Sequence, residues 1–220
     1  MTLLNASLKL SQRNIAKATL RWVCVAVPLL ISVSDVRQIA LAGGNEPLQT
    51  ILPDSIVHYD ISGTASAQIR AQLQKLSPMY VDGKQYAGKT TWSMRYRTLG
   101  ARAVPSGCEV RQVEVSVSVF YTMPRWVNLD KASAVLSKQW REYYAALLTH
   151  EEGHAKIAHA AADTLRAALT RLPANVPCAT FREQQSQVNR LVLDQFRKQQ
   201  AKYDEETQHG RTQGAVFPPP

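Results

Sequence analysis

Residues 131–171 constrain the fold of this chain more than any other stretch. They contain no proline and a single glycine, Gly153. An unbroken helix of this length would span roughly 60 Å at about 1.5 Å per residue, which is long for one domain. The pattern therefore predicts a long helix whose length favours a break or a bend. Side chains that recur at helical spacing along one face are Val135, Tyr143, Leu147, His150, His154 and Ile157.

This helix carries a possible metal-binding motif. His150, Glu151 and His154 stand in the order HExxH, so the two imidazoles lie one turn apart on one face and can bind a single ion. Glu151 is turned about 100° from His150, which places its carboxylate beside the ion, where it can act as general base toward a zinc-activated water. The competing interpretation is a solvated polar face on an alanine-rich helix. The single Gly153 costs about 1 kcal/mol relative to alanine, and close approach of another segment is the usual reason.

A catalytic zinc takes three protein ligands, so a third must be found. His159 lies five residues past His154, about 140° around the helix, and Asp163 about 180° away, so both face elsewhere. The third ligand is therefore expected from another segment, and "YDEETQHG" near the end of the chain is the candidate.

Within that segment His209, next to Gly210 at an expected helix end, is the preferred ligand. The alternatives that stay open are Asp204, Glu205 and Glu206. His58 is interpreted as an ordinary strand histidine. Tyr203 or Tyr143 could donate a hydrogen bond to an oxyanion, although packing against the metal-binding helix is the simpler interpretation for both.

The rest of the chain predicts a sheet followed by helices. Residues 56–61, 92–97 and 108–124 alternate apolar and polar side chains as strands do, and a helix is expected over 64–77 between the first two. A last helix is expected from the capping box Thr180–Glu183 to about Glu206. This order indicates an α+β, zincin-like fold: an N-terminal twisted, mostly antiparallel sheet with one helix, followed by the long metal-binding helix and a C-terminal helix.

The first 42 residues resemble a secretory signal. Basic residues precede an apolar run at 22–33, and "ALA" at 40–42 fits a cleavage site. A membrane anchor is the alternative, but the run has 12 residues and contains Pro28, whereas a spanning helix needs about 20. We therefore expect a signal peptide at 1–42, a flexible leader at 43–53, one domain at 54–218, and no stable membrane span after cleavage.

Charge and cysteines fit an exported domain. Residues 1–42 hold five of the 26 Lys and Arg and one of the 17 Asp and Glu, so the net charge of +9 falls to +5 for the rest. These charges are dispersed, which argues against a nucleic-acid partner. Cys24 lies in the signal, and the remaining pair, Cys108 and Cys178, is most simply a disulfide in an oxidising compartment, with two free thiols as the alternative.

Several stretches together resemble one family. They are "YDISGTASAQIRAQL", "TTWSMRYR", "CEVRQVEVSVSVFYTMPRW", "HEEGHAKIA", "PCATF" and "YDEETQHGRTQGAVFP". In combination they resemble the DUF922 family of predicted secreted zinc-dependent proteases. The resemblance implies export, a metal helix at His150, Glu151 and His154, and a disulfide between Cys108 and Cys178.

The sequence thus predicts an exported zinc metallopeptidase, secreted or periplasmic, that acts on a peptide or protein substrate in the cell envelope. Zn²⁺ would be bound by His150, His154 and His209, with Glu151 as general base. Two alternatives stay open. One is a non-catalytic cell-envelope protein with a structural or regulatory zinc, and the other is an amide hydrolase of peptidoglycan.

Overall fold

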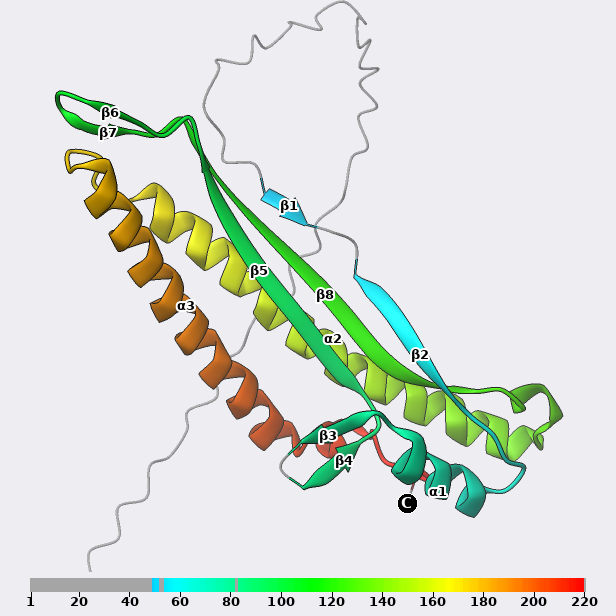
Figure 1. Ribbon diagram of the computed structural model, residues 1–220. Helices are drawn as coiled ribbons and strands as arrows, with labels where there is room; N and C mark the ends of the chain where they lie inside the picture. Colours follow the sequence, from blue (N-terminus) through cyan, green and yellow to red (C-terminus); the bar gives the residue numbers. More distant parts are fainter. Residues whose placement is uncertain (1–48, 52–53, 82, 220) are drawn as a thin grey trace, which may run out of the picture. The chain divides into compact units, whose positions relative to one another are not determined.

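The computed structural model describes residues 49–51, 54–81 and 83–219 (Figure 1). The predicted signal at 1–42 and most of the predicted leader lie outside these residues. Among the helices that are described, none is long and apolar enough to cross a membrane. Residues 49–51 of the predicted leader form a short strand, β1 (Gln49–Ile51). Three residues are too few to show an alternating pattern, so the sequence did not predict this strand.

The strands that precede the long helices match the alternation in the sequence. Val113, Val115, Val117 and Val119 of β8 are buried on one face, as expected. The elements before the long helices are β2 (Ser55–Ile61), α1 (Ser66–Leu76), β3 (Met79–Val81), β4 (Lys84–Tyr86), β5 (Lys89–Leu99), β6 (Arg102–Val104), β7 (Gly107–Glu109) and β8 (Gln112–Trp126). After them come η1 (Leu129–Lys131), α2 (Ala134–Thr170), α3 (Cys178–Thr207) and η2 (Arg211–Gln213).

The main sheet is mixed, where the sequence predicted a mostly antiparallel one. β8 lies in its centre, with β5 antiparallel along one edge and β2 and β1 parallel to it. Two small antiparallel pairs, β3–β4 and β6–β7, complete the strands. Alternation shows which side chains face the core but not the direction of the partner strand, and the chain between β2 and β8 is long enough for the crossover that parallel pairing needs.

α2 is a single unbroken helix of 37 residues, so the expected break is absent. Its length of about 55 Å matches that of β8, whose 15 residues span about 50 Å, and the two elements contact each other. Ser133 caps α2 by accepting from the backbone N–H of Leu136. Val135, grouped by its spacing with Tyr143 and His150 along one face, is 69% exposed, whereas those two residues are buried, and Leu136 is the buried residue of the first turn.

α3 packs against α2, and its two ends are held differently (Figure 1). It begins at Cys178, two residues before the expected capping box, after Pro177 as N-cap. Cys178 forms the predicted disulfide with Cys108 of β7, which ties the start of α3 to the β6–β7 pair. Small residues of α2 are nearly fully buried between its neighbours, namely Ala155, Ala158, Ala161 and Ala162.

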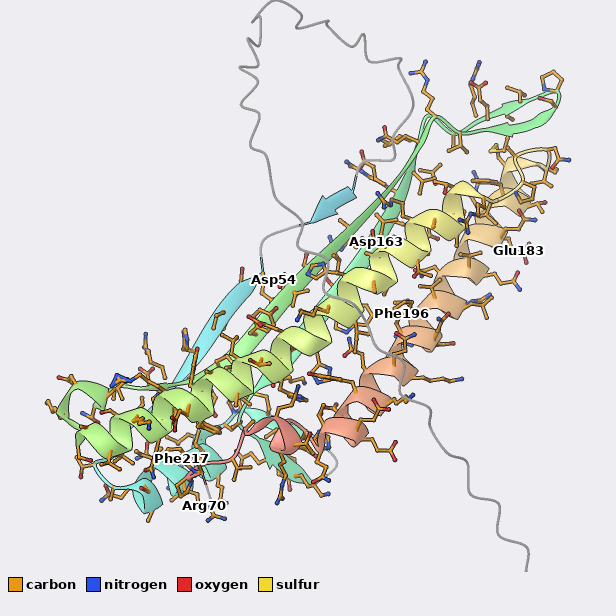
Figure 2. The ribbon with its side chains drawn as sticks, turned by 180° about the vertical axis from the view of Figure 1, so that it is seen from behind. Asp54, Arg70, Asp163, Glu183, Phe196 and Phe217 are labelled. Atoms are coloured by element: carbon orange, nitrogen blue, oxygen red, sulfur yellow. A yellow bond between two sulfur atoms is a disulfide. The ribbon has the colours of Figure 1, made fainter. Side chains whose placement is uncertain are left out.

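The segment after α3 returns to α2. Phe217 is buried and its ring lies 5.6 Å from that of Trp140 and 5.4 Å from that of Tyr143 (Figure 2). Tyr143 therefore packs in the core, which confirms the simpler of its two interpretations. This anchor holds η2 and the turn before it against the middle of α2.

Candidate metal centre

The motif residues on α2 are buried. His150 is 4% exposed, Glu151 3% and His154 8%, so the solvated polar face is excluded. Their side chains line a cavity of about 520 Å³ that also borders β4, the start of β5, the end of α3 and η2. A buried polar cluster of this kind needs partners for its charges and hydrogen bonds.

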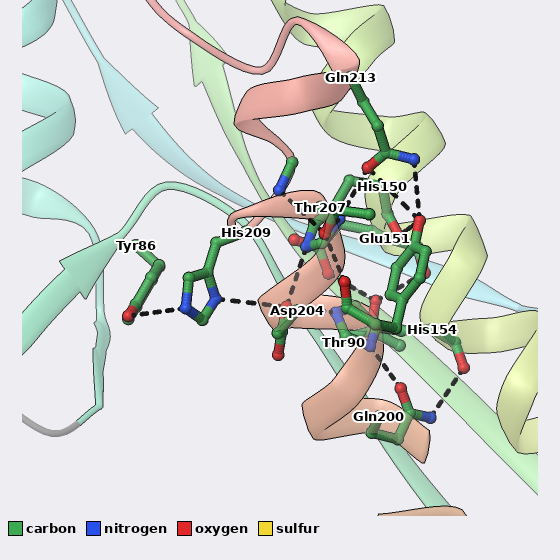
Figure 3. Close-up of polar contacts among 12 residues, drawn as sticks. Tyr86, Thr90, His150, Glu151, His154, Gln200, Asp204, Thr207, His209 and Gln213 are labelled. Carbon is green, nitrogen blue, oxygen red and sulfur yellow. Dashed lines mark hydrogen bonds and ion pairs between the residues drawn. The ribbon is translucent and has the colours of Figure 1, made fainter. Parts of the chain in front are cut away.

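The partner that both imidazoles share is Asp204, near the end of α3 (Figure 3). Its Oδ1 lies 3.3 Å from Nε2 of His150 and 3.0 Å from Nε2 of His154. The three side chains offer one ligand atom each within 4.8 Å of one another, so together they could hold a metal ion. Two imidazole nitrogens and one carboxylate oxygen are ligands that zinc commonly takes.

Two glutamines fix how the imidazoles present these atoms. Nε2 of Gln200 donates to the backbone carbonyl of His154 at 3.0 Å, so its Oε1 must be the atom that faces Nδ1 of the same histidine. Gln213 likewise places Oε1 3.0 Å from Nδ1 of His150, while its amide donates to the hydroxyl of Tyr203. An amide oxygen can only accept, so each Nδ1 carries a proton and each ring turns its Nε2 toward Asp204.

The two Nε2 atoms and the carboxylate oxygen of Asp204 form a group that could hold a cation. A neutral imidazole nitrogen and a carboxylate oxygen repel each other at about 3 Å unless a proton or a metal ion lies between them. Burial lowers the pKa of His154, but its hydrogen bonds to Asp204 and Gln200 outweigh burial and raise it. Burial raises the pKa of Asp204, but hydrogen bonds with His150 and His154 outweigh this and hold it well below its ordinary value.

The close approach of α3 depends on Gly153. A Cβ at this position would lie 2.0 Å from the hydroxyl oxygen of Tyr203, so no larger residue fits without a shift. The ring of Tyr203 stacks on His150 at 5.1 Å and meets His154 edge-on at 5.0 Å. Its hydroxyl donates to the backbone carbonyl of His150 at 3.2 Å. The close approach inferred from the glycine is confirmed, and Tyr203 packs against α2, which is the simpler of its two interpretations.

His209, the ligand preferred from the sequence, is not part of the group of three. Its Nδ1 lies 3.3 Å from Asp204 Oδ1, its side chain is 46% exposed, and its ring packs on Tyr86 with centroids 4.5 Å apart. The reason is the backbone: α3 ends at Thr207, and Gln208, His209 and Gly210 all have positive φ. This turn directs His209 toward the cavity wall, and the carboxylate one turn earlier reaches the imidazoles.

The turn also explains Gly210. Its φ is +82°, and a Cβ would lie 3.1 Å from the ring of His150. The chain can therefore pass over His150 only at a glycine, which brings Gln213 to the Nδ1 of that histidine.

Glu151 points to the side of the cavity formed by the sheet. Thr90 of β5 places its hydroxyl 2.7 Å from Glu151 Oε2, which holds the carboxylate in one orientation. Burial raises the pKa of Glu151, and the hydrogen bond from Thr90 and the charges of the two histidines only partly oppose this. A carboxylate with a raised pKa beside a metal group is what a general base needs.

The remaining histidines and acids lie elsewhere. His58 is 3.4 Å from the hydroxyl of Tyr144, and His159 is 3.4 Å from Asp54, as their exclusion predicted. Asp163 pairs with Arg166 one turn further along α2. The two other acidic alternatives, Glu205 and Glu206, are exposed.

Three residues of the centre were missed from the sequence: Gln200, Gln213 and Thr90. Gln200, Tyr203, Asp204 and Thr207 recur at helical spacing, and that stripe is a signal that could have identified Asp204 and Gln200. Thr90 and Gln213 have no such signal, because only the tertiary fold brings them to the motif.

Comparison with known proteins gives one match. A family model described as a bacterial protein of unknown function, DUF922, matches residues 56–210. No curated protein and no solved structure matches the chain. The matched range contains the three residues of the metal group, Glu151 and both disulfide cysteines. The chain therefore belongs to the DUF922 family.

Proposed function

We propose that this protein is an exported zinc-dependent peptidase in which His150, His154 and Asp204 bind the metal and Glu151 is the general base. The observation that carries the proposal is the convergence of two Nε2 atoms and one carboxylate oxygen beside a buried glutamate, in a cavity. Among the described residues the group has three protein ligands, which is typical of catalytic zinc, whereas structural zinc takes four. This favours an enzyme over a structural or regulatory zinc.

The chain's own groups divide the chemistry. A bound divalent metal would lower the pKa of a water to about 7 and polarise a carbonyl. Glu151 takes up a proton from the attacking water and passes it to the leaving amine, and burial, which raises the pKa of its carboxyl, helps it to hold the proton between the two steps. Thr90 keeps the carboxylate in place, and Gln200 and Gln213 orient the imidazoles.

The sheet offers a place for an extended substrate. β5 pairs with β8 along one edge, and no described strand pairs with its other edge. Lys89 and Thr90, the first residues of β5, line the cavity next to Glu151. A peptide can add to such an edge through backbone hydrogen bonds, and this supports peptide bonds as the substrate.

Export is part of the proposal. The Cys108–Cys178 disulfide is compatible with an extracytoplasmic location, where thiols are oxidised. We infer secretion or residence in the periplasm, in agreement with the signal predicted at 1–42.

The test compares two neighbouring glutamates. Glu151 is buried in the cavity, whereas Glu152 is exposed on the same helix. Zinc content and hydrolysis of an unstructured protein are measured for the full-length chain and for Glu151→Gln and Glu152→Gln. We expect one zinc per chain in all three, and a loss of about 10² to 10⁴ in rate for Glu151→Gln alone. A chain without stoichiometric zinc, or unchanged hydrolysis by Glu151→Gln, would contradict the proposal. Purified peptidoglycan as a second substrate tests the alternative of a peptidoglycan amide hydrolase.

A further inference from the structure

Positive side chains surround the mouth of the metal cavity. Lys84 of β4, Lys89 of β5 and Arg211 of η2 all line it and are exposed. None of the three forms an ion pair with another described residue, although seven ion pairs of other Lys or Arg residues are found in the described part of the chain. These charges are thus available to a ligand. We call Lys84, Lys89 and Arg211 the basic rim.

The floor of the cavity has the opposite charge. Glu151 and Asp204 are its two carboxylates, and a divalent ion on the metal group would neutralise them. The three charges of the basic rim remain uncompensated in that state. The field at the mouth is therefore positive, while the centre, where a bond would be cleaved, is close to neutral.

The basic rim is divided between two walls. Lys84 and Lys89 belong to the strand side, and Arg211 belongs to the turn after α3. The walls meet where Tyr86 contacts His209. Between them the cavity also has apolar lining, including Met79, Trp92 and Leu147.

We propose that this cavity selects extended polypeptide segments that carry acidic side chains on both sides of a neutral, partly apolar bond. The inference rests on the proposed function for the cleavage step, but the selection itself is a property of binding. The acidic side chains of the segment meet the basic rim, and its central backbone lies over Glu151 and Asp204. A continuous polyanion fits less well, because part of its charge would also lie over this neutral, partly apolar centre and not at the basic rim.

The experiment measures binding without cleavage, on full-length Glu151→Gln loaded with zinc. Three fluorescent probes are compared by anisotropy: a decapeptide with two glutamates on each side of a central Ala-Leu pair, the same peptide with lysines, and a short oligothymidylate of equal negative charge. Exposed charge pairs are individually weak but several act together here, so we expect the glutamate peptide to bind about tenfold tighter than the lysine peptide. Raising the salt to about 1 M should remove most of the difference.

Charge reversal shows whether the basic rim is responsible. In Lys84→Glu/Lys89→Glu the glutamate peptide should bind about tenfold more weakly and the lysine peptide more tightly than before. The control Lys131→Glu/Lys198→Glu has the same net charge, changes two exposed lysines outside the cavity, and should leave both affinities within about twofold. Zinc content is measured on every variant, to show that the metal centre is intact.

Three results would overturn the inference. They are equal binding of the two peptides, an equal loss in the control variant, and tighter binding of the oligothymidylate than of the glutamate peptide. Loss of the proposed function would appear separately, as a wild-type chain that hydrolyses no peptide, and it would leave the binding comparison readable.

Discussion

Replacing Gly153 with alanine tests the packing that brings Asp204 to the motif. In an ordinary helix the change would stabilise the protein by about 1 kcal/mol, because glycine is the poorer helix former. Here the new Cβ would lie 2.0 Å from the hydroxyl oxygen of Tyr203 and 2.3 Å from the ring carbon that bears it. Since the atom it meets is the rigid end of an aromatic ring, α3 must move away from α2.

The magnitude follows from three contributions. Overpacking costs roughly 1 to 3 kcal/mol. The hydroxyl of Tyr203 also loses two hydrogen bonds, to the carbonyl of His150 and from Gln213, each worth about 1 kcal/mol. Set against the helical gain of about 1 kcal/mol, Gly153→Ala should lower the free energy of unfolding by about 2 to 4 kcal/mol. Because Asp204 follows Tyr203, zinc affinity should fall by about 10- to 100-fold, as when a residue that orients a ligand is changed.

Unfolding in urea and competition with a chromophoric chelator measure the two effects. Ala160→Gly is the control: this residue is exposed on the same helix, so the change should cost about 1 kcal/mol through helix propensity and leave zinc affinity unchanged. In Gly153→Ala/Tyr203→Ala the obstacle is gone, and the alanine at 153 should then cost nothing further. A Gly153→Ala protein that is more stable than wild type and binds zinc equally well would refute the reasoning.

Three further predictions concern the ligand set, pH and the disulfide. Asp204→Asn should lower zinc affinity by at least about 100-fold in chelator competition, whereas His209→Asn should stay within about threefold; the reverse order would make His209 the ligand. In the metal-free protein the pKa of His154 is raised, so the stabilisation from its pairing with Asp204 is fully present below about pH 6.5 and is lost as pH rises through the folded pKa. The pKa of Asp204 is lowered, so the stabilisation from its carboxylate is present above about pH 4 and is lost in stronger acid. Urea unfolding against pH should therefore show this stabilisation between about pH 4 and 6.5, and its absence in Asp204→Asn. Replacing Cys108 and Cys178 with alanine should lower the free energy of unfolding by about 4 kcal/mol, as expected for a separation of 70 residues. Zinc affinity should change little, because the disulfide holds the end of α3 opposite to Asp204. A loss of zinc affinity as large as that in Asp204→Asn would show that the two ends of α3 are coupled.

The sequence predicted those features that depend on local periodicity. The valines of β8 alternate, so its buried face was recognised, and the absence of proline predicted α2. What the sequence could not provide was the pairing of elements. The direction of β2 relative to β8 depends on a crossover, and the unbroken course of α2 depends on packing against other elements, among them β8.

The same division applies to the metal centre. His150, Glu151 and His154 follow from a spacing of four residues and were found at once. The third position was narrowed to one short segment, but the choice within it depended on where α3 ends. His209 lies beyond the last helical residue, Thr207, in a turn with positive φ. Asp204 is still helical and lies on the stripe that faces α2. Residue type alone favoured His209 as the third residue of the group, whereas the position along α3 brings Asp204 to the two imidazoles.

The burial of the motif also bears on whether it has a function. A polar face on a surface helix would leave His150 and Glu151 in water, but both are less than 5% exposed. Removing two imidazoles and two carboxylates from water costs several kcal/mol unless each is fully paired, and replacing such a group with apolar residues often stabilises a protein. In this centre three separate elements supply the partners: α3 supplies Asp204 and Gln200, β5 supplies Thr90, and η2 supplies Gln213. Two Nε2 atoms that face one carboxylate oxygen need a proton or a cation between them, which is why we propose this cluster as a metal site.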